Sequence, residues 1–278
     1  MGAETKINAK DKLMAFRPKI GYPDEWKGFE GISISDEDVL SNVQNLRKFF
    51  QAQSVERELL KTDRERWGMA PQQVNAYYNS SFNEIVFPAA ILQAPFFDPN
   101  ADDAVNYGAI GAVIGHEMGH GFDDQGSKSD ANGIQRNWWT AEDRAAFEVK
   151  ADKLAAQYSE YEPIPGNFVN GRNSLGENIG DVGGLAMAYH AYQLSLNGKE
   201  APVIDGLTGD QRFFLAWAQV WREKRTEQSM LNQLRAGTHA PGRYRAQAPR
   251  NHDAWYKAFN VQPGDALYLA PEDRVRIW

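Results

Sequence analysis

The amino-acid sequence predicts a mostly helical α+β fold with a small β-sheet. Apolar residues recur every three or four positions in several long segments, which is the spacing that forms one face of a helix. The stretch 74–88 is instead rich in β-branched and aromatic residues around a central turn, as is typical of paired strands. Of the 278 residues, 42% are hydrophobic and 12% aromatic, so the chain can bury a sizeable core.

The first predicted helix begins at Ser35-Asp36-Glu37-Asp38 and extends to about Lys61. Such polar side chains favour a helix N-terminus because they accept hydrogen bonds from the free backbone amides of the first turn. Apolar residues follow at helical spacing, which predicts an amphipathic packing helix.

A second, buried helix is expected over 104–122, where small residues separate the apolar ones and Gly121 marks the end. Three further helices are expected, each opened by a capping residue. They cover about 140–159, 174–196 and 207–226, with Thr140, Ser174 and Thr208 in the capping positions.

The segments VNAYY and FNEIVF, on either side of Asn79-Ser80-Ser81, predict a hairpin or paired extended strands. The last forty residues combine Pro, Gly, Arg and aromatics, and we expect them to be irregular but compact. No repeat and no clear linker interrupts the chain. We therefore expect one domain after the polar start of the chain.

Composition excludes several classes of function. The net charge of −7 argues against a nucleic acid partner, whose phosphates require a basic surface. The absence of cysteine excludes thiolate catalysis and disulfides, and leaves His, Asp and Glu as metal ligands. The polar first dozen residues contain no signal peptide, and the apolar stretch 86–97 is too short to span a membrane. We expect a soluble chain without a membrane partner, either cytoplasmic or exported from a bacterium.

The sequence His116-Glu117-Met118-Gly119-His120 lies inside the predicted buried helix. Residues four apart share a helix face, so both imidazoles can bind one metal ion. Glu117 lies about a third of a turn away, where it can reach a water molecule on the metal without being a ligand. Zinc in such a site keeps one position for water and lowers its pKa to about 7, which allows a neighbouring carboxylate to act as general base.

This five-residue motif also occurs by chance in helices that bind no metal. Here the preceding residues, 110–115, are apolar, so the histidines are expected to be buried rather than to lie on a solvated face. Burying two histidines beside a glutamate costs desolvation energy, and a metal ion compensates for it better than a neutral partner. The context therefore favours a metal site.

Two histidines require a third protein ligand, and Glu177 is the best candidate because it begins a predicted helix. Asp181 lies four residues further on, on the same helix face, where it can accept a hydrogen bond from a ligating histidine. Either acid alone also fits a simpler role, in which it stabilises the positive end of the helix dipole. The upstream motif favours the metal-binding interpretation.

Seven segments together resemble, in the same order, the neprilysin-like zinc endopeptidases of peptidase family M13, which include bacterial oligopeptidases. They are VNAYYN (74–79), IVFPAAILQAPFF (85–97), GAVIGHEMGHGFDDQG (111–126), NWW (137–139), ENIGD (177–181), HAPGRYR (239–245) and RIW (276–278). The resemblance covers residues 20–278 and implies one catalytic domain there, preceded by a polar N-terminal segment over 1–19. It implies a thermolysin-like zincin catalytic domain with one Zn²⁺ ion and a peptide substrate.

The resemblance also implies residue roles at the matching positions. His116, His120 and Glu177 would bind zinc. Glu117 would be the general base that later passes its proton to the leaving amine. Asp181 would be the carboxylate that hydrogen-bonds a zinc-binding histidine. His239 would stabilise the oxyanion. The remaining positions would bind substrate: Asn75 and Ala76 its backbone, Arg245 a carbonyl after the cut, and Ile91, Phe96, Val113 and Trp221 the apolar side chain after the scissile bond.

Several of these residues also fit simpler roles. Without the family, His239 would be a solvated loop histidine, and the four apolar residues could simply form core. His190 and His252 match no functional position, and we expect them to be structural. An exopeptidase specificity is one alternative function, and a binding subunit that retains the fold, either non-catalytic or dependent on a partner, is another.

Two features depart from the family pattern. Family members are more than twice as long, because an upstream helical lobe covers the active site. Val275 stands where the disulfide-rich animal enzymes have cysteine, which indicates a bacterial relative. The chain is therefore expected to be either the catalytic half of a longer protein or a chain whose lid is a separate protein. Exposed apolar surface would then cause it to self-associate or to require that partner.

Overall fold

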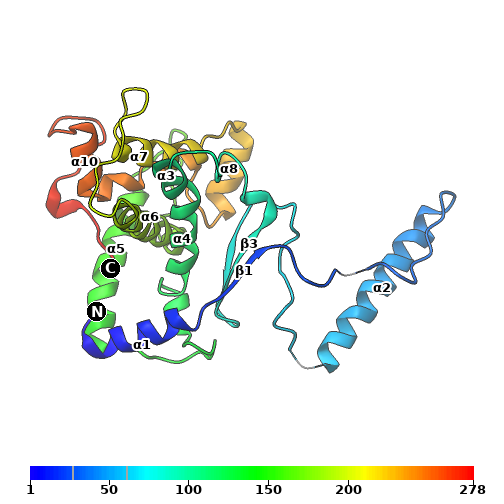
Figure 1. Cartoon of the computed structure of the whole chain (residues 1–278). Helices are drawn as coiled ribbons and strands as arrows, with labels where there is room; N and C mark the ends of the chain where they lie inside the picture. Colours follow the sequence, from blue (N-terminus) through cyan, green and yellow to red (C-terminus); the bar gives the residue numbers. More distant parts are fainter. Residues whose placement is uncertain (27, 61) are drawn as a thin grey trace. The chain divides into compact units, whose positions relative to one another are not determined.

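The computed structural model describes residues 1–26, 28–60 and 62–278. The chain divides into two compact units (Figure 1). The larger unit combines Met1–Gly21 with Pro71–Trp278, and the smaller one consists of Tyr22–Ala70. The expected boundary between residues 19 and 20 therefore falls within the larger unit.

The larger unit is mostly helical, as predicted. Its α-helices are α1 (Ala3–Met14), α3 (Asp103–Asn106), α4 (Ala112–His120), α5 (Ala141–Ser159), α6 (Leu175–Ser195), α7 (Gly209–Val220), α8 (Glu227–Ala236), α9 (Gly242–Arg245) and α10 (Asp253–Phe259). Short 3-10 turns lie at Ala89–Ile91 (η1), Gly126–Lys128 (η3), Ala248–Asn251 (η4) and Pro271–Asp273 (η5). The last forty residues thus form short helices and turns rather than irregular structure throughout.

Three strands form the small sheet in the order β1-β3-β2. Strands β2 (Tyr77–Asn79) and β3 (Glu84–Pro88) pair antiparallel, which confirms the predicted hairpin. Strand β1 (Arg17–Gly21) lies parallel to β3 on its other side and was not predicted. Every residue of β3 is buried, whereas β2 lies at the edge of the sheet.

The helix predicted over 104–122 is a run of three consecutive helical segments. Helix α3 continues into a π-helical turn, η2 (Tyr107–Gly111), and then into α4, which ends at His120. In a π-helix each backbone amide bonds one residue further back than in an α-helix, and such turns often lie next to functional sites. Both histidines of the motif therefore lie on α4, directly after this turn.

Helices α4 and α6 pack with their backbones in close contact, and glycines make this possible. A Cβ atom added at Gly184 would lie 2.3 Å from the backbone nitrogen of His116, and one added at Gly115 would lie 2.6 Å from the carbonyl oxygen of Gly184. A Cβ atom at Gly180 would meet Nδ1 of His116 at 2.7 Å. Any larger side chain at these positions would push the first part of α6 away from the histidines.

The predicted N-caps have mixed outcomes. Thr140 caps α5 through the amide of Asp143, and Thr208 forms a capping box with Gln211 at α7. The side chain of Ser174 does not cap α6, because its hydroxyl donates to the carbonyl of Asn170 instead. Helix α7 ends at Val220, earlier than the predicted residue 226, and α8 begins after a break.

Helix α1 lies in the segment predicted only to be polar. Lys12, a residue of this polar sequence, is 1% exposed. The buried face of α1 thus depends on contacts with distant parts of the chain, which hydrophobic periodicity does not reveal. None of the helices in the described ranges is both long and apolar enough to cross a membrane.

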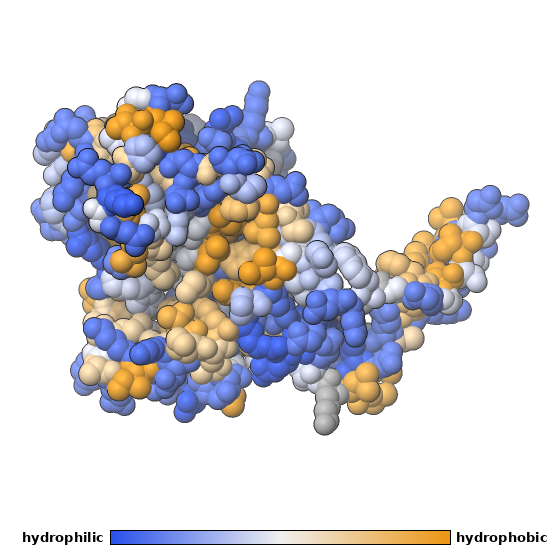
Figure 2. Space-filling model, viewed as in Figure 1, coloured by the Kyte–Doolittle hydropathy of each residue, from blue (hydrophilic) through white to orange (hydrophobic). Residues whose placement is uncertain are grey.

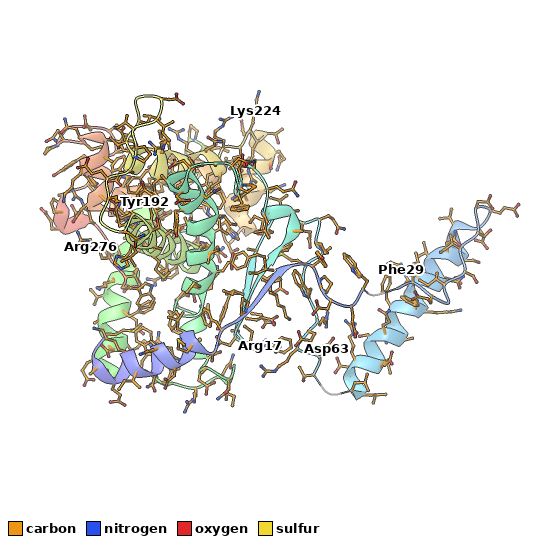
Figure 3. All side chains as sticks on the ribbon, viewed as in Figure 1. Arg17, Phe29, Asp63, Tyr192, Lys224 and Arg276 are labelled. Carbon is orange, nitrogen blue, oxygen red and sulfur yellow. The ribbon has the colours of Figure 1, made fainter. Side chains whose placement is uncertain are left out.

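In the smaller unit, α2 (Val39–Leu59) begins after Asp38, whose side chain accepts a hydrogen bond from the amide of Ser41. The predicted end, Lys61, lies outside the described residues. Phe29 lies beside α2 (Figure 3) and contacts Phe49 and Phe50. The helix was expected to pack, but none of its described residues is buried, and apolar residues remain on its surface (Figure 2).

The close packing of α4 on α6 can be tested by replacing Gly184 with alanine. We expect the free energy of unfolding to fall by about 1 to 3 kcal/mol, because the added methyl group overpacks two backbones. Urea unfolding followed by circular dichroism measures the effect. Gly183→Ala on the same helix is the matched control, since its Cβ would meet only the side chain of Trp278, at 3.3 Å. Equal stability of both variants would contradict this interpretation of the interface.

Candidate metal centre

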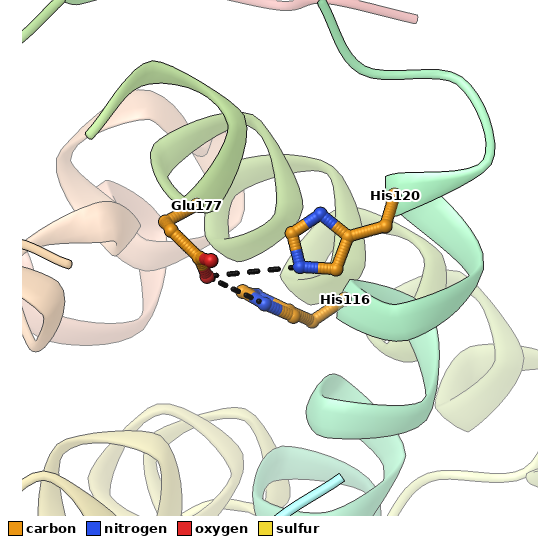
Figure 4. A group of neighbouring side chains, drawn as sticks. All are labelled: His116, His120 and Glu177. Carbon is orange, nitrogen blue, oxygen red and sulfur yellow. Dashed lines mark ion pairs between the residues drawn. The ribbon is translucent and has the colours of Figure 1, made fainter. Parts of the chain in front are cut away.

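The predicted metal ligands lie together at the interface of α4 and α6. His116 and His120 project from consecutive turns of α4, and the Glu177 carboxylate faces both from the first turn of α6 (Figure 4). One ligand atom from each residue lies within 4.8 Å of the other two. Oε2 of Glu177 is 3.2 Å from Nε2 of His116 and 3.6 Å from Nε2 of His120.

These distances fit a tetrahedral zinc ion. Zinc binds nitrogen and carboxylate oxygen at about 2.0–2.2 Å, so two ligand atoms in a tetrahedral site are about 3.4 Å apart. The observed distances of 3.2 and 3.6 Å lie on either side of this value. Two neutral imidazoles and one carboxylate also form a donor set that suits zinc. The three residues therefore fit the predicted ion.

Asp181 orients the first histidine, as its spacing from Glu177 suggested. Its Oδ1 atom lies 2.9 Å from Nδ1 of His116, which leaves Nε2 of the same ring directed at Glu177. Arg245 on α9 donates to both oxygens of Asp181, from Nε at 2.8 Å and from Nη2 at 2.6 Å. Asp181 is fully buried, so this guanidinium compensates for a charge that water cannot reach.

The second histidine has its own carboxylate, which the sequence analysis missed. Asp123, in the loop after α4, accepts from Nδ1 of His120 at 2.8 Å through Oδ2. Its other oxygen accepts from the backbone amides of Gln125 and Gly126. The signal was an acid three residues after a motif histidine, in a glycine-bounded loop that predicts a tight turn.

Glu117 lies beside the ligands on α4 and is 5% exposed. Burial raises the pKa of its carboxyl group, although the neighbouring histidines oppose the shift. Among the residues that the structure describes, none donates a hydrogen bond to its Oε2 atom. A buried carboxylate with a free oxygen and a raised pKa has the properties of a general base.

His239 also reaches the centre, from the loop before α9. Its Nε2 atom lies 2.9 Å from Oε2 of Glu177, and its side chain is 47% exposed. Gln233 donates to the backbone carbonyl of His239 and thereby holds this loop against α8. The exposed side of the imidazole can therefore face a ligand in solution.

The charges of the centre are strongly coupled. Burial opposes ionisation of Glu177, but hydrogen bonds from His116, His120 and His239 lower its pKa. Burial alone would lower the pKa values of His116 and His120, whereas their carboxylate partners raise both. Burial likewise opposes ionisation of Asp181, and Arg245 lowers the pKa of this carboxyl group.

The predicted substrate-binding residues fall into two groups. Ala76, just before edge strand β2, packs with Ile91, Phe96 and Val113 in one apolar cluster, while Asn75 beside it is exposed. Trp221 instead packs against the main core, with the Arg245 guanidinium 3.6 Å from the centre of its ring. Arg245, predicted to bind a substrate carbonyl, is buried against Asp181.

The two remaining histidines lie away from the ligands, at a separate apolar cavity of about 800 Å³ between α1, α6 and the C-terminal residues. Burial lowers the pKa of His252 to about 4. His190 lies on the exposed side of α6. Neither joins the cluster of residues around Glu177.

Comparison with known proteins gives consistent matches. The model of peptidase family M13 matches residues 75–275. The whole chain aligns with human neprilysin at 36% identity and with mouse endothelin-converting enzyme 1 at 38% identity, covering 39% and 37% of their lengths. The chain thus spans about two fifths of these curated relatives.

Solved structures agree. The Mycobacterium tuberculosis zinc metalloprotease Zmp1 in complex with an inhibitor matches with a TM-score of 0.98 and 50% identity, covering 100% of this chain and 43% of that one. PepO from Lactobacillus rhamnosis matches with a TM-score of 0.89 and 35% identity, covering 99% and 42%. These matches confirm the predicted zincin-type fold.

The buried pair of Asp181 and Arg245 predicts a large effect of Asp181→Asn. The substitution leaves Arg245 charged and uncompensated, so we expect the free energy of unfolding to fall by about 3 to 5 kcal/mol. Zinc affinity should fall about 10- to 100-fold, because His116 loses its orienting carboxylate. Chemical unfolding and competition with a chromophoric chelator measure the two effects.

The matched control is Asp152→Asn, which breaks the exposed ion pair with Arg172 on the surface of the same unit. An exposed pair contributes at most about 1 kcal/mol, and both side chains of this one are more than 60% exposed. Similar losses in both variants would show that the buried pair does not support the centre.

Proposed function

Because this chain belongs to peptidase family M13, we propose that it forms the catalytic part of a zinc-dependent endopeptidase that cleaves oligopeptides. The observation that carries the proposal is the gathering of His116, His120 and Glu177 within bonding distance of one ion, with Glu117 buried beside them. The chain covers only about two fifths of these longer relatives, so peptidase activity of the chain itself is part of the proposal.

Glu117 supplies the proton transfer in this proposal. A zinc ion held by the three ligands would act as a Lewis acid toward water and the substrate carbonyl. The Glu117 carboxylate then takes a proton from the attacking water and passes it to the leaving amine. Its burial supports this role, because a raised pKa brings the carboxyl group closer to the pH at which it must both accept and release a proton.

We further propose that His239 stabilises the negative charge that develops on the substrate carbonyl oxygen during attack. Its partly exposed imidazole at the edge of the centre supports this role, since a donor aimed at a developing charge lowers the barrier by a few kcal/mol. Asp181 holds His116 in one orientation. Arg245 fixes Asp181, and a carbonyl contact with substrate is proposed for the same guanidinium.

The edge of the sheet offers a surface for the substrate backbone. Among the described residues, β2 is an edge strand with β3 as its neighbour, and an extended peptide can add to a sheet edge through main-chain hydrogen bonds. Asn75 and Ala76 lie directly before this strand and are proposed to bind the peptide there. The exposed side chain of Asn75 supports the assignment.

The proposal includes a preference for an apolar residue after the scissile bond. Ile91, Phe96 and Val113 share one apolar cluster with α4, which supports a common pocket. Trp221 belongs to the other cluster, but its ring lies against Arg245, which is itself linked to the centre through Asp181. Substrate length and sequence would be set by these residues together with the part of the enzyme that covers them.

The relatives' additional length supports the proposal that a lid covers the active site, either in the same polypeptide or as a separate protein. Apolar side chains on the unit Tyr22–Ala70 are candidates for contact with it. Val39, Leu40 and Leu59 of α2 are each more than two-thirds exposed. Surfaces with several exposed apolar residues commonly mark binding sites for other protein segments.

Peptide hydrolysis by the purified chain tests the proposed activity. Turnover of a quenched fluorescent peptide library should be lost with a chelator and should fall at least about 1,000-fold in Glu117→Gln, because the proton acceptor is removed. The glutamine keeps the size of the side chain, so zinc content should stay unchanged. Measured zinc content separates loss of chemistry from loss of metal.

Hydrolysis that persists in Glu117→Gln would overturn the assigned mechanism. A folded, zinc-loaded chain without any turnover would favour the alternative that this region acts as a binding subunit or requires a lid chain. Adding a lid region like that of the longer relatives in trans separates these two possibilities, since only a lid-dependent enzyme would gain activity.

A second prediction concerns the exposed face of α2. The chain on its own should self-associate, and replacing Val39, Leu40 and Leu59 by serine should shift it toward the monomer, since exposed apolar area is removed. Light scattering coupled to size-exclusion chromatography measures the mass. Val149→Ser, an equally exposed apolar residue on α5, is the control. A monomeric wild-type chain with full peptidase activity would contradict the need for a lid.

A further inference from the structure

Lys12 on α1 is a buried cation that the mechanism does not use. It is 1% exposed, and its Nζ atom donates to three backbone carbonyls, those of Gly121, Gly126 and Ser129, each at 2.7 Å. An ammonium group has three donors, so all of them are satisfied. These carbonyls lie more than one hundred residues from Lys12 in the sequence.

The environment of the ammonium group is costly for a charge. The rings of Tyr78, Phe122 and Trp138 surround Nζ with their centroids 5.7 to 5.9 Å away. Burial lowers the pKa of Lys12 to about 8, while the nearby carboxylates of Asp123 and Asp130 oppose the shift. Three carbonyls and three aromatic faces offset this cost, which indicates that the lysine holds its position firmly.

All three carbonyl partners belong to the loop that follows α4, the helix that contains both histidines. In this loop the amide of Gly126 donates to Oδ1 of Asp123 at 2.7 Å, while the carbonyl of the same glycine accepts from Lys12. The other oxygen of Asp123 holds Nδ1 of His120 at 2.8 Å. Gly126 thus connects the lysine to the carboxylate that orients a proposed zinc ligand.

The same loop packs tightly against the end of α4. A Cβ atom at Gly126 would lie 1.7 Å from the carbonyl oxygen of His120, so the loop and the ligand share one close contact. Asn83 links α1 to the residues just after this loop, because its side-chain amide donates to the carbonyls of Lys12 and Ala131 at 3.0 and 3.2 Å. A shift of the loop would therefore move Asp123 relative to the imidazole.

We propose that Lys12 is a positioning residue of the metal centre. It holds the loop 121–129 by three hydrogen bonds, so that Asp123 fixes the orientation of His120 for metal binding. This inference rests on the proposed function, because it takes the ion at His116, His120 and Glu177 as given. It extends the centre to a helix that has no part in the zinc-binding motif.

Zinc affinity of the apoprotein tests the proposal directly. Lys12→Met keeps a long, unbranched side chain and removes all three donors. We therefore expect Zn²⁺ to bind about tenfold more weakly, which is at the low end of the effects seen when a group that hydrogen-bonds a metal ligand is changed. Competition of zinc ions with a chromophoric chelator measures this affinity. Lys10→Met, an exposed lysine on the same helix, should leave it unchanged.

A double-mutant cycle separates positioning from general stabilisation. If Lys12 acts through Asp123, then Lys12→Met should weaken zinc binding in the wild-type background but not in Asp123→Ala, since the orienting carboxylate is already absent. A merely structural lysine would instead weaken binding by the same factor in both backgrounds. Thermal unfolding of the four proteins, without zinc, reports stability separately from affinity.

The outcomes distinguish a failure of the proposed metal centre from a failure of the proposed role of Lys12. If the wild-type chain binds no zinc, or if Glu177→Gln leaves zinc binding unchanged, the proposed metal centre fails. If the wild type binds zinc and Lys12→Met binds it equally well, or if Lys12→Met weakens binding by the same factor in both backgrounds, only the role of Lys12 is refuted. Should Lys12→Met not fold, Lys12→Gln retains one donor group and is compared in the same cycle by the same criteria.

Discussion

The close contact between α4 and α6 is the constraint on which the centre depends. Glu177 and His116 lie on different helices, and their side chains meet at 3.2 Å only because glycines allow the two backbones to touch. At Gly184 and Gly180 a single methyl group would collide with His116 itself. Small residues here do not serve flexibility. They set the distance between two rigid elements, and therefore the distance between the groups that would share an ion.

Each motif histidine is oriented by a hydrogen-bonded carboxylate, and the two carboxylates are anchored in different ways. Asp181 is buried and is balanced by the charge of Arg245, whose own burial is compensated in return. Asp123 is held instead by backbone amides of a tight turn. One imidazole therefore depends on a buried ion pair and the other on the conformation of a loop. Disturbing helix packing and disturbing the loop should affect the two ligands separately.

The sequence predicts those helices, strands and site residues that depend on local sequence patterns. Helical spacing identified α5 and α6 almost to the residue, the hairpin followed from strand composition and a turn, and the spacing of His116, His120, Glu177 and Asp181 placed four side chains correctly on two helix faces. It could not predict α1, β1 or the burial of Lys12. Those features depend on partners far away in the sequence, and a lysine in a polar segment carries no local sign that three carbonyls will surround it.

Because its parts come from distant segments, the centre is a product of folding of the larger unit as a whole. The ligands lie on α4 and α6, their carboxylate partners are fixed by Arg245 of α9 and by the loop after α4, and that loop is held by α1. Apart from the local hydrogen bonds of Asp123, these contacts join segments that are far apart in the sequence. The relative positions of the ligands therefore depend on the packing of the whole unit. A catalytic group beside such a site needs the same rigidity, which explains why the first helix of the unit contributes to a centre whose motif begins more than a hundred residues later.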